Sequence, residues 1–299
     1  MRNRPITEEE QEEIRSRYPE IFEKCLETAG SFMHEFDTRS AFSVSEEERV
    51  EQYEKLWSEP GFKKWLSNFY DVMMPGPANE DYAEFFRNKI RERVKDPMVA
   101  EMLAPKDHMF GSKRLPCESG YYEVYNQDNT ADAHYEFDVI IYATGYDAVT
   151  GSLNRMHIQG KNGLTLQEKF AEGPRTFMGI QSVDFPNLFT INAASVGNFV
   201  RAAEPLVEWI SECAVSACGP PARFTRSRHR PTRQSEDEWT QHMIEGGKNI
   251  LRTQADNWFV GANIPGKARF LLTAPDTAPV MRAKRAEIAS DGYKGFNLE

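Results

Sequence analysis

The feature that most constrains this chain is an apolar run, Val139-Ile-Ile-Tyr-Ala143, which ends at once in Thr144-Gly145. Such a run beside turn residues predicts a strand that is buried on both faces of a parallel sheet. Gly145 lacks the Cβ that would keep the backbone at a distance, so the strand end can approach another group closely. In open α/β sheets, ligands bind at that end of the strands. The run therefore predicts an α/β fold with a binding site near residue 145.

Composition narrows the classes of partner. The formal net charge of -10 raises the cost of approaching a polyanion, so we expect no nucleic-acid partner. No apolar stretch is long enough to cross a bilayer, and residues 1–10 lack the apolar segment of a secretory signal, so we expect a cytoplasmic protein without a membrane span. The four cysteines form no CxxC pair, and the six histidines show no metal-ligand spacing. We therefore predict no metal site.

Residues 1–105 have the pattern of successive helices. Thr7 with Glu10, and Ser45 with Glu48, are capping-box pairs that predict two helix starts. A third helix is expected from Asn79, and we expect it to end near Asp96-Pro97. Its apolar residues recur every three or four positions and form one buried stripe: Tyr82, Phe85, Phe86, Ile90 and Val94. On pattern alone, this block is equally well a helical bundle that binds a protein partner.

The remainder of the chain mixes short extended segments with helices. We expect strands over 120–126, 138–143, 177–180 and 188–191, and helices over 166–170 and 202–213. The arginine-rich stretch 218–235 is expected to be a solvated loop, with a dedicated anion site as the alternative. A further helix is expected to begin near Glu236, with Trp239 and Met243 on its apolar face.

Two motifs carry side chains suited to binding anions and aromatic rings. In Lys113-Arg114, arginine offers a planar, permanently charged fork and lysine a point charge, although such pairs are also common on surfaces without any function. The segment from Trp258 to Lys267 reads W-x-x-G-A-N-I-P-G-K, and on pattern alone it is a packed turn. Each motif therefore needs context before it indicates a site.

Taken in order, these motifs resemble the Baeyer–Villiger and related FAD-binding monooxygenases, and the resemblance runs from about residue 7 to the end. The fold class that it implies is α/β, a partial two-dinucleotide-binding (Rossmann-like) flavoprotein with a large helical subdomain. The implied domains are a helical subdomain of the NADP domain at 1–105, a remnant of the NADP-binding domain at 106–137, and the C-terminal part of the FAD-binding domain at 138–299.

The resemblance also implies an activity and a site. Relatives use FAD and NADPH to insert oxygen beside the carbonyl of a ketone, giving an ester or lactone, and here the substrate would be a bulky secondary metabolite such as a terpenoid or polyketide. Arg114 matches the catalytic arginine that stabilises the anion formed on the flavin. The residues that match cofactor contacts are Lys113, Trp258 and Asn263 for NADP, and Ala143, Thr144, Gly145 and Asp147 for FAD.

One part of the family pattern is missing from this sequence. No strand, G-x-G-x-x-G turn and helix follow one another in residues 1–105, and in the family the N–H groups of that turn hold the FAD pyrophosphate. The sequence therefore indicates a truncated member, for which a partner chain would supply the missing FAD half. The alternatives are a catalytically inactive remnant and a helical protein-interaction module.

Overall fold

The computed structural model describes residues 5–127, 136–191, 197–216 and 229–298, in two compact units. Unit 1 consists of residues 1–7, 34–146 and 249–255, and unit 2 of residues 8–33, 147–248 and 256–299. Each unit contains segments that are far apart in the sequence. They are described separately below.

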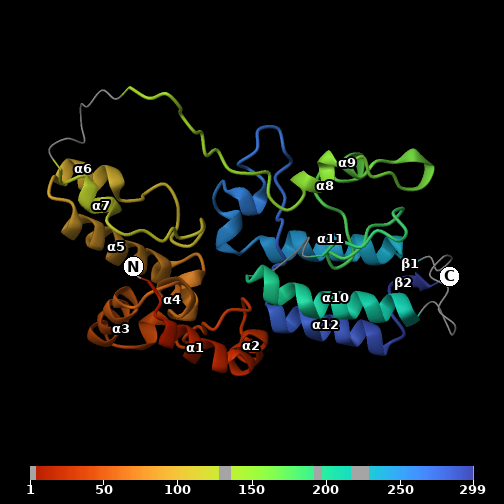
Figure 1. Ribbon diagram of the computed structural model, residues 1–299, viewed down its shortest axis with the longest axis horizontal. Helices are drawn as coiled ribbons and strands as arrows, with labels where there is room; N and C mark the ends of the chain where they lie inside the picture. The colour runs from red at the N-terminus through yellow and green to blue at the C-terminus, as the bar shows by residue number, and fades with distance from the viewer. Residues whose placement is uncertain (1–4, 128–135, 192–196, 217–228, 299) are drawn as a thin grey trace. The chain divides into compact units, whose positions relative to one another are not determined.

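Unit 1 is built from helices and the loops that join them (Figure 1). In chain order they are η1 (Ala41–Ser43), α3 (Glu46–Ser58), α4 (Lys63–Leu66), η2 (Tyr70–Met73), α5 (Pro77–Arg93), α6 (Pro97–Leu103), α7 (Tyr121–Val124) and η4 (Leu251–Thr253). Helix α3 begins where expected, because the Ser45 side chain accepts the backbone N–H of Glu48 at 3.2 Å. Asp96 caps α6 in the same way, accepting the N–H of Met98 at 2.8 Å.

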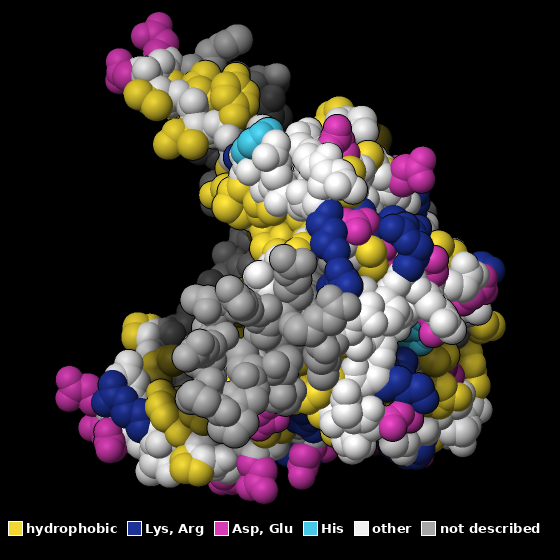
Figure 2. All heavy atoms as spheres, turned by 90° about the vertical axis from the view of Figure 1, so that its right-hand side faces the viewer, with side chains coloured by type: hydrophobic (Ala, Val, Ile, Leu, Met, Phe, Trp, Pro, Cys, Tyr) yellow, Lys and Arg dark blue, Asp and Glu magenta, His cyan; other side chains and the backbone are white. Residues whose placement is uncertain are grey.

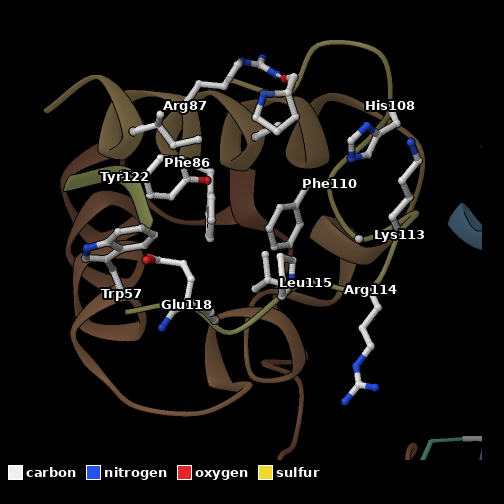
Figure 3. A pocket seen from close by; sticks show the side chains of 16 residues that line it. Trp57, Phe86, Arg87, His108, Phe110, Lys113, Arg114, Leu115, Glu118 and Tyr122 are labelled. Carbon is white, nitrogen blue, oxygen red and sulfur yellow. Dashed lines mark hydrogen bonds between the residues drawn. The ribbon is translucent and has the colours of Figure 1, made fainter. Parts of the chain in front are cut away.

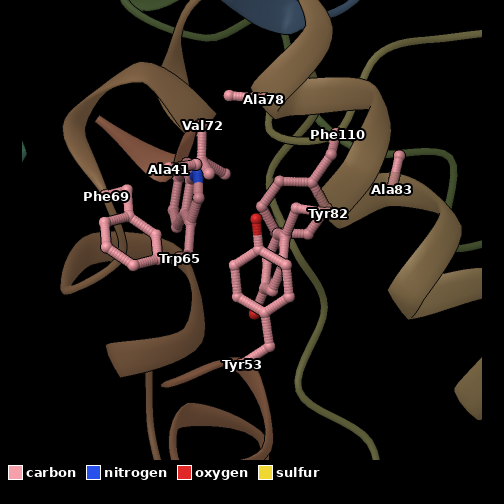
Figure 4. Close-up of a cluster of buried hydrophobic side chains, with 9 residues drawn as sticks. All are labelled: Ala41, Tyr53, Trp65, Phe69, Val72, Ala78, Tyr82, Ala83 and Phe110. Atoms are coloured by element: carbon pink, nitrogen blue, oxygen red, sulfur yellow. The ribbon is translucent and has the colours of Figure 1, made fainter. Parts of the chain in front are cut away.

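The core of unit 1 is a cluster of aromatic rings between α3, α4 and α5 (Figure 4). The ring centroid of Tyr82 lies 4.6 Å from that of Tyr53 and 4.8 Å from that of Phe110. The Tyr53 hydroxyl reaches a carboxylate, donating to Asp81 Oδ2 at 3.1 Å, so this phenol is buried without losing its hydrogen bond. Tyr82 belongs to the apolar stripe expected on α5, so this stripe contributes to the aromatic core.

Unit 2 contains α1 (Glu8–Ser16), α2 (Tyr18–Glu27), α8 (Gly151–Arg155), η3 (Lys161–Gly163), α9 (Leu166–Lys169), α10 (Phe199–Ser216), α11 (Arg233–Gly247), η5 (Trp258–Val260) and α12 (Ala278–Ser290). Strands β1 (His229–Pro231) and β2 (Phe296–Leu298) pair antiparallel, with Arg230 opposite Asn297. Helices α10 and α12 lie side by side (Figure 1), and the Trp209 indole N–H donates to Arg285 O at 2.9 Å. The helices expected over 166–170 and 202–213 are confirmed.

A buried carboxylate joins α9 to α11 in unit 2. Glu236 is 1% exposed, and its Oε1 accepts the N–H of Val183 at 2.7 Å. Its Oε2 accepts Lys169 Nζ at 2.6 Å, and Arg175 Nε lies 3.7 Å from the same oxygen. Burying this charge is tolerated because cations and an N–H donor replace its lost water.

The expected strands are the main correction. Residues 138–143 form no strand, and their apolar side chains are exposed: Val139 by 73%, Ile140 by 63%, Ile141 by 87% and Tyr142 by 80%. Residues 121–124 form helix α7 and not a strand. Residues 177–191 contain no strand, and their one β-type pairing is an isolated bridge between Phe177 and Gln181. A buried parallel strand needs neighbours on both sides, and the described residues contain only the β1–β2 pair. The apolar pattern is present, but its partner strands are not.

Other expectations fall partly outside the described residues. The arginine-rich stretch is described only from residue 229, and there it forms β1 and the start of α11 instead of a loop. Helix α11 begins at Arg233, three residues before the expected start, because the Thr232 side chain accepts the Ser235 N–H at 3.1 Å. Within α1 and α2, Cys25 is the one buried residue, while Tyr18 and Phe22 remain about two-fifths exposed.

Candidate functional site

The turn that carries Lys113-Arg114 is anchored by one buried amide. Asn79, on the first turn of α5, is 1% exposed, and its Nδ2 donates to Val72 O at 2.7 Å and to Phe110 O at 2.8 Å. Its Oδ1 accepts the Phe110 N–H at 3.1 Å. The next residue, Gly111, has φ of +79°, and a Cβ there would lie 3.1 Å from the Trp65 indole nitrogen. Asn79 and Gly111 together fix the backbone position of the turn that leads into Lys113 and Arg114.

Lys113 and Arg114 line a pocket in unit 1 (Figure 3) with a cavity volume of about 170 Å³. Its apolar walls come from α3, α5, α7 and the turn after Phe110: Trp57, Phe86, Ile90, Phe110, Leu115 and Tyr122. Figure 3 shows the Arg114 guanidinium directed away from these rings, while Lys113 lies beside His108. The two cations therefore stand at the margin of an apolar pocket.

The two cations differ in how they are partnered. Lys113 Nζ lies 3.6 Å from Asp107 Oδ2, and the hydrogen bond from His108 holds the pKa of the Asp107 carboxyl below its usual value. Arg114 is exposed and lies over the Phe62 ring, with 5.4 Å from its guanidinium carbon to the ring centroid. Arg114 makes no ion pair with a carboxylate among the residues that the structure describes. Its charge is therefore free to meet an anion.

Ala143, Thr144 and Gly145 lie in an exposed, extended stretch of unit 1. Gly145 has φ of +86°, so the glycine is required by the backbone conformation, because other residues rarely adopt it. A Cβ at this position would meet nothing within 4 Å. Close approach, which was the expected reason for the glycine, is therefore absent here.

Asp147, Trp258 and Asn263 belong to unit 2. The Asp147 carboxylate pairs with Lys267 Nζ, so a residue two positions after Gly145 meets the last residue of the Trp258 to Lys267 motif. A Cβ on Gly151 would lie 2.5 Å from the Asp147 Cβ, which explains why that position is a glycine. Trp258 is half-buried and stacks on Phe259 at 3.9 Å, and Asn263 is exposed.

Three residues of these arrangements escaped the sequence interpretation. The sequence marks Asn79 only as a helix start, and nothing in its pattern reveals a cross-link to residue 110. Lys267 stood inside the quoted motif, and its pairing with Asp147 could have been proposed from the opposite charges. Lys64 is the second of two adjacent lysines, and nothing in that pattern indicates burial, yet it is 3% exposed and lines the pocket of unit 1.

Charged side chains of both signs lie together on the surface of the described residues (Figure 2). The face in Figure 2 carries Lys and Arg side chains interspersed with Asp and Glu in its described part, and not one cationic area. Across residues 5–127, 136–191, 197–216 and 229–298, no group of three or more His, Cys, Asp or Glu side chains could hold a metal ion. In those same residues, each helix is too short or too polar to cross a bilayer.

Comparison with known proteins gives a consistent set of relatives, although no protein-family model matches the chain. It is 38% identical over 323 residues to 2-oxo-Delta(3)-4,5,5-trimethylcyclopentenylacetyl-CoA monooxygenase of Pseudomonas putida, a match that covers 99% of this chain and 58% of the relative. It is 32% identical over 321 residues to cyclopentanone 1,2-monooxygenase of Comamonas sp., covering 100% of this chain and 58% of the relative. The chain thus spans less than two thirds of the length of these relatives.

Solved structures agree with the sequence matches. The chain superposes on OTEMO in complex with FAD and NADP with a TM-score of 0.88 and 37% identity, covering 99% of this chain and 58% of that one. Cyclohexanone monooxygenase from Rhodococcus sp. Phi1, bound to NADP+, gives a TM-score of 0.89 and 33% identity, covering 99% and 59%. These structures show the fold class as that of a partial two-dinucleotide-binding flavoprotein.

Proposed function

The chain belongs to the Baeyer–Villiger and related FAD-binding monooxygenases, and we propose that it forms the helical subdomain and C-terminal part of such an enzyme. The observation that carries this proposal is the match over 99% of the chain to a Baeyer–Villiger-type relative at 38% identity. The division into 1–105, 106–137 and 138–299 is part of the same proposal. In it, Arg114 is the catalytic residue, and Lys113, Trp258 and Asn263 contact NADP.

The residues of this chain fit the two cofactors unequally. The Lys113 ammonium suits a phosphate group of NADP, and the Arg114 guanidinium, which has no carboxylate partner among the described residues, suits an anion that forms during the reaction. For FAD, the expected contacts Ala143 to Gly145 lie in an exposed stretch, and the described residues contain no strand, Gly-rich turn and helix whose N–H groups could hold a pyrophosphate. The described part of this chain therefore does not form an FAD site by itself.

The apolar surface of residues 139–142 supports a role for the part of the family fold that lies outside this sequence. All four residues are more than 60% exposed. Such a segment buries its apolar area when strands pair with it on both sides. We propose that the rest of the flavoprotein, in the same polypeptide or in a partner chain, supplies those strands and the pyrophosphate turn.

Co-expression tests this proposal. The chain would be produced with the N-terminal part of the Pseudomonas putida relative that it does not match, and the purified complex assayed for NADPH oxidation that depends on an added ketone. We expect co-purification, bound flavin and ketone-dependent turnover. Failure of the two parts to associate, or a complex without flavin, would defeat the proposal.

A second candidate function is a catalytically inactive remnant or a helical protein-interaction module. The observation that favours it is the exposed 138–146 segment without a flavin site in the described residues. Limited proteolysis tests the interaction module, because that function requires residues 7–105 to fold alone and to survive removal of residues 106–299. Ketone-dependent turnover in the co-expressed complex would exclude the inactive remnant.

The substrate is proposed at the level of a ketone. The names of two relatives specify cyclopentanone and cyclohexanone, and that of a third specifies a cyclopentenylacetyl-CoA. A cyclic ketone is therefore the first class to assay, followed by the bulkier terpenoid and polyketide ketones expected from the resemblance. A cytoplasmic location likewise stays a prediction.

A further inference from the structure

The pocket of unit 1 contains a buried amine that the proposed function does not use. Lys64, on α4, is 3% exposed, and its Nζ donates to Glu59 O at 3.1 Å and lies 5.6 Å from the Trp57 ring centroid. An ammonium group has three N–H donors, and this one has a single oxygen acceptor. It forms no ion pair with a carboxylate among the described residues. An acceptor entering the pocket would complete its hydrogen bonding.

The other charged groups that line the pocket are mostly neutralised. Arg87 pairs with Glu80 and Glu84, and Glu118 accepts Arg93 at 2.7 Å. Lys113 lies near Asp107, as described above. This leaves Lys64 within the pocket and Arg114 at its margin as cations without a carboxylate. The uncompensated charge of the pocket is therefore positive, which favours an anionic ligand.

The size and walls of the pocket set the rest of the ligand. A cavity of about 170 Å³ is close to the roughly 150 Å³ of an apolar cavity that holds one benzene. Four aromatic rings surround it: Trp57, Phe86, Phe110 and Tyr122 (Figure 3). Such walls favour a flat or chair-shaped hydrocarbon body, and the volume admits a single six-membered ring with one small substituent.

We propose that this pocket binds a monocyclic carboxylate, with the hydrocarbon ring among the aromatic side chains and the carboxylate accepting hydrogen bonds from Lys64. Binding depends only on side chains of unit 1. It goes beyond the proposed monooxygenase function and needs neither FAD nor NADP. Burial lowers the pKa of Lys64 below its ordinary value, with Cys117, Glu118 and Glu59 opposing the shift, and a bound carboxylate would compensate the buried charge.

The test uses the full chain and two probes of one shape. Cyclohexanecarboxylate carries the charge, and cyclohexanecarboxamide is its neutral counterpart. NMR titration should show saturable binding of the carboxylate in the millimolar range or tighter, with intermolecular NOEs to the Trp57 ring. The amide should bind about tenfold more weakly or worse, because it lacks the charge-assisted hydrogen bond.

Matched variants locate the effect. Lys64→Met should weaken carboxylate binding by about tenfold or more, whereas Lys63→Met should leave it unchanged, because Lys63 is 44% exposed and does not line the pocket. Ala83→Leu should fill the pocket and abolish binding of both probes, with circular dichroism confirming the fold. Equal affinity of Lys64→Met and the parent, equal affinity for the amide, or no saturable binding would each overturn the proposal.

Discussion

Burial of the Lys64 side chain costs folding free energy, because its ammonium group loses water. Its neighbours on α4 are a half-buried lysine and a tryptophan of the aromatic core, yet Lys64 itself places an ammonium near a ring. Desolvation disfavours the charged form, and this is the main reason that its pKa falls below 10.5. A charged group kept in such a place without a carboxylate is a better candidate for binding than for stability.

Replacing Lys64 by methionine should therefore stabilise the protein at neutral pH. A folded pKa below the unfolded one means that the protonated form opposes folding below the folded pKa, and that this penalty vanishes as pH rises to 10.5. We expect Lys64→Met to raise the midpoint of thermal unfolding by a few degrees near pH 7, and by less at pH 10. Scanning calorimetry at the two pH values measures this, and a lower midpoint at pH 7 would contradict it.

Asn79, in contrast, stabilises the folded state, because its side-chain hydrogen bonds join backbone groups of the same unit. Asn79→Ala would leave Val72 O and both backbone groups of Phe110 without their buried partner. We expect a loss of about 2 to 3 kcal/mol in the free energy of unfolding, measured by urea titration. Asn88→Ala is the control, because Asn88 is exposed and should change the value by less than about 0.5 kcal/mol. Equal losses in the two variants would show that the anchor is unimportant.

At the scale of elements, helices could be predicted from the sequence and strands could not. The start of α3 at Ser45 and the end of α5 before Asp96-Pro97 depend on residues within one turn, so local pattern reveals them. Residues 138–143 carry an equally clear apolar pattern, but whether it becomes a strand depends on partners elsewhere in the fold. The same dependence explains why 177–180 and 188–191 are irregular in the structure.

The α9 to α11 connection offers an element-scale prediction. Lys169→Met would leave the carboxylate of Glu236, 1% exposed, with only the more distant Arg175 as a cation. We expect a loss of about 3 kcal/mol in unfolding free energy. Lys248→Met removes an exposed pair with Glu245 and should cost at most about 0.5 kcal/mol. Urea titration of both variants checks this, and comparable costs would refute a structural role for the buried charge.

The candidate site was predictable only where motif and geometry coincide. The quoted motifs located Lys113, Arg114, Asp147 and Trp258, and the structure supplies their surroundings: the Asp147–Lys267 pair and the pocket beside Lys113. Contacts between distant parts of the chain, such as Asn79 with Phe110, leave no trace in local spacing. Lys64 was missed because burial is a property of the fold and not of residue type.

At the scale of the whole molecule, the exposed run at 139–142 should govern behaviour of the chain alone. An extended, uncharged apolar segment with unpaired backbone groups favours self-association. Ile141→Lys should reduce association in analytical ultracentrifugation, and it should leave the thermal midpoint nearly unchanged because Ile141 is 87% exposed. Val183→Lys is the contrasting variant, since Val183 is buried and its replacement should unfold unit 2. Unaltered self-association of Ile141→Lys would show that residues 139–142 do not mediate the association.

The flavin content of the purified protein tests the central claim most directly. The ratio of flavin absorbance to protein would be measured for the chain alone and for the chain co-expressed with the N-terminal part of a relative. We expect no retained flavin for the chain alone and a one-to-one ratio for the complex, because the strands and pyrophosphate turn come from the added part. A chain that retains stoichiometric flavin by itself, or a complex that remains colourless with added FAD, would contradict the account.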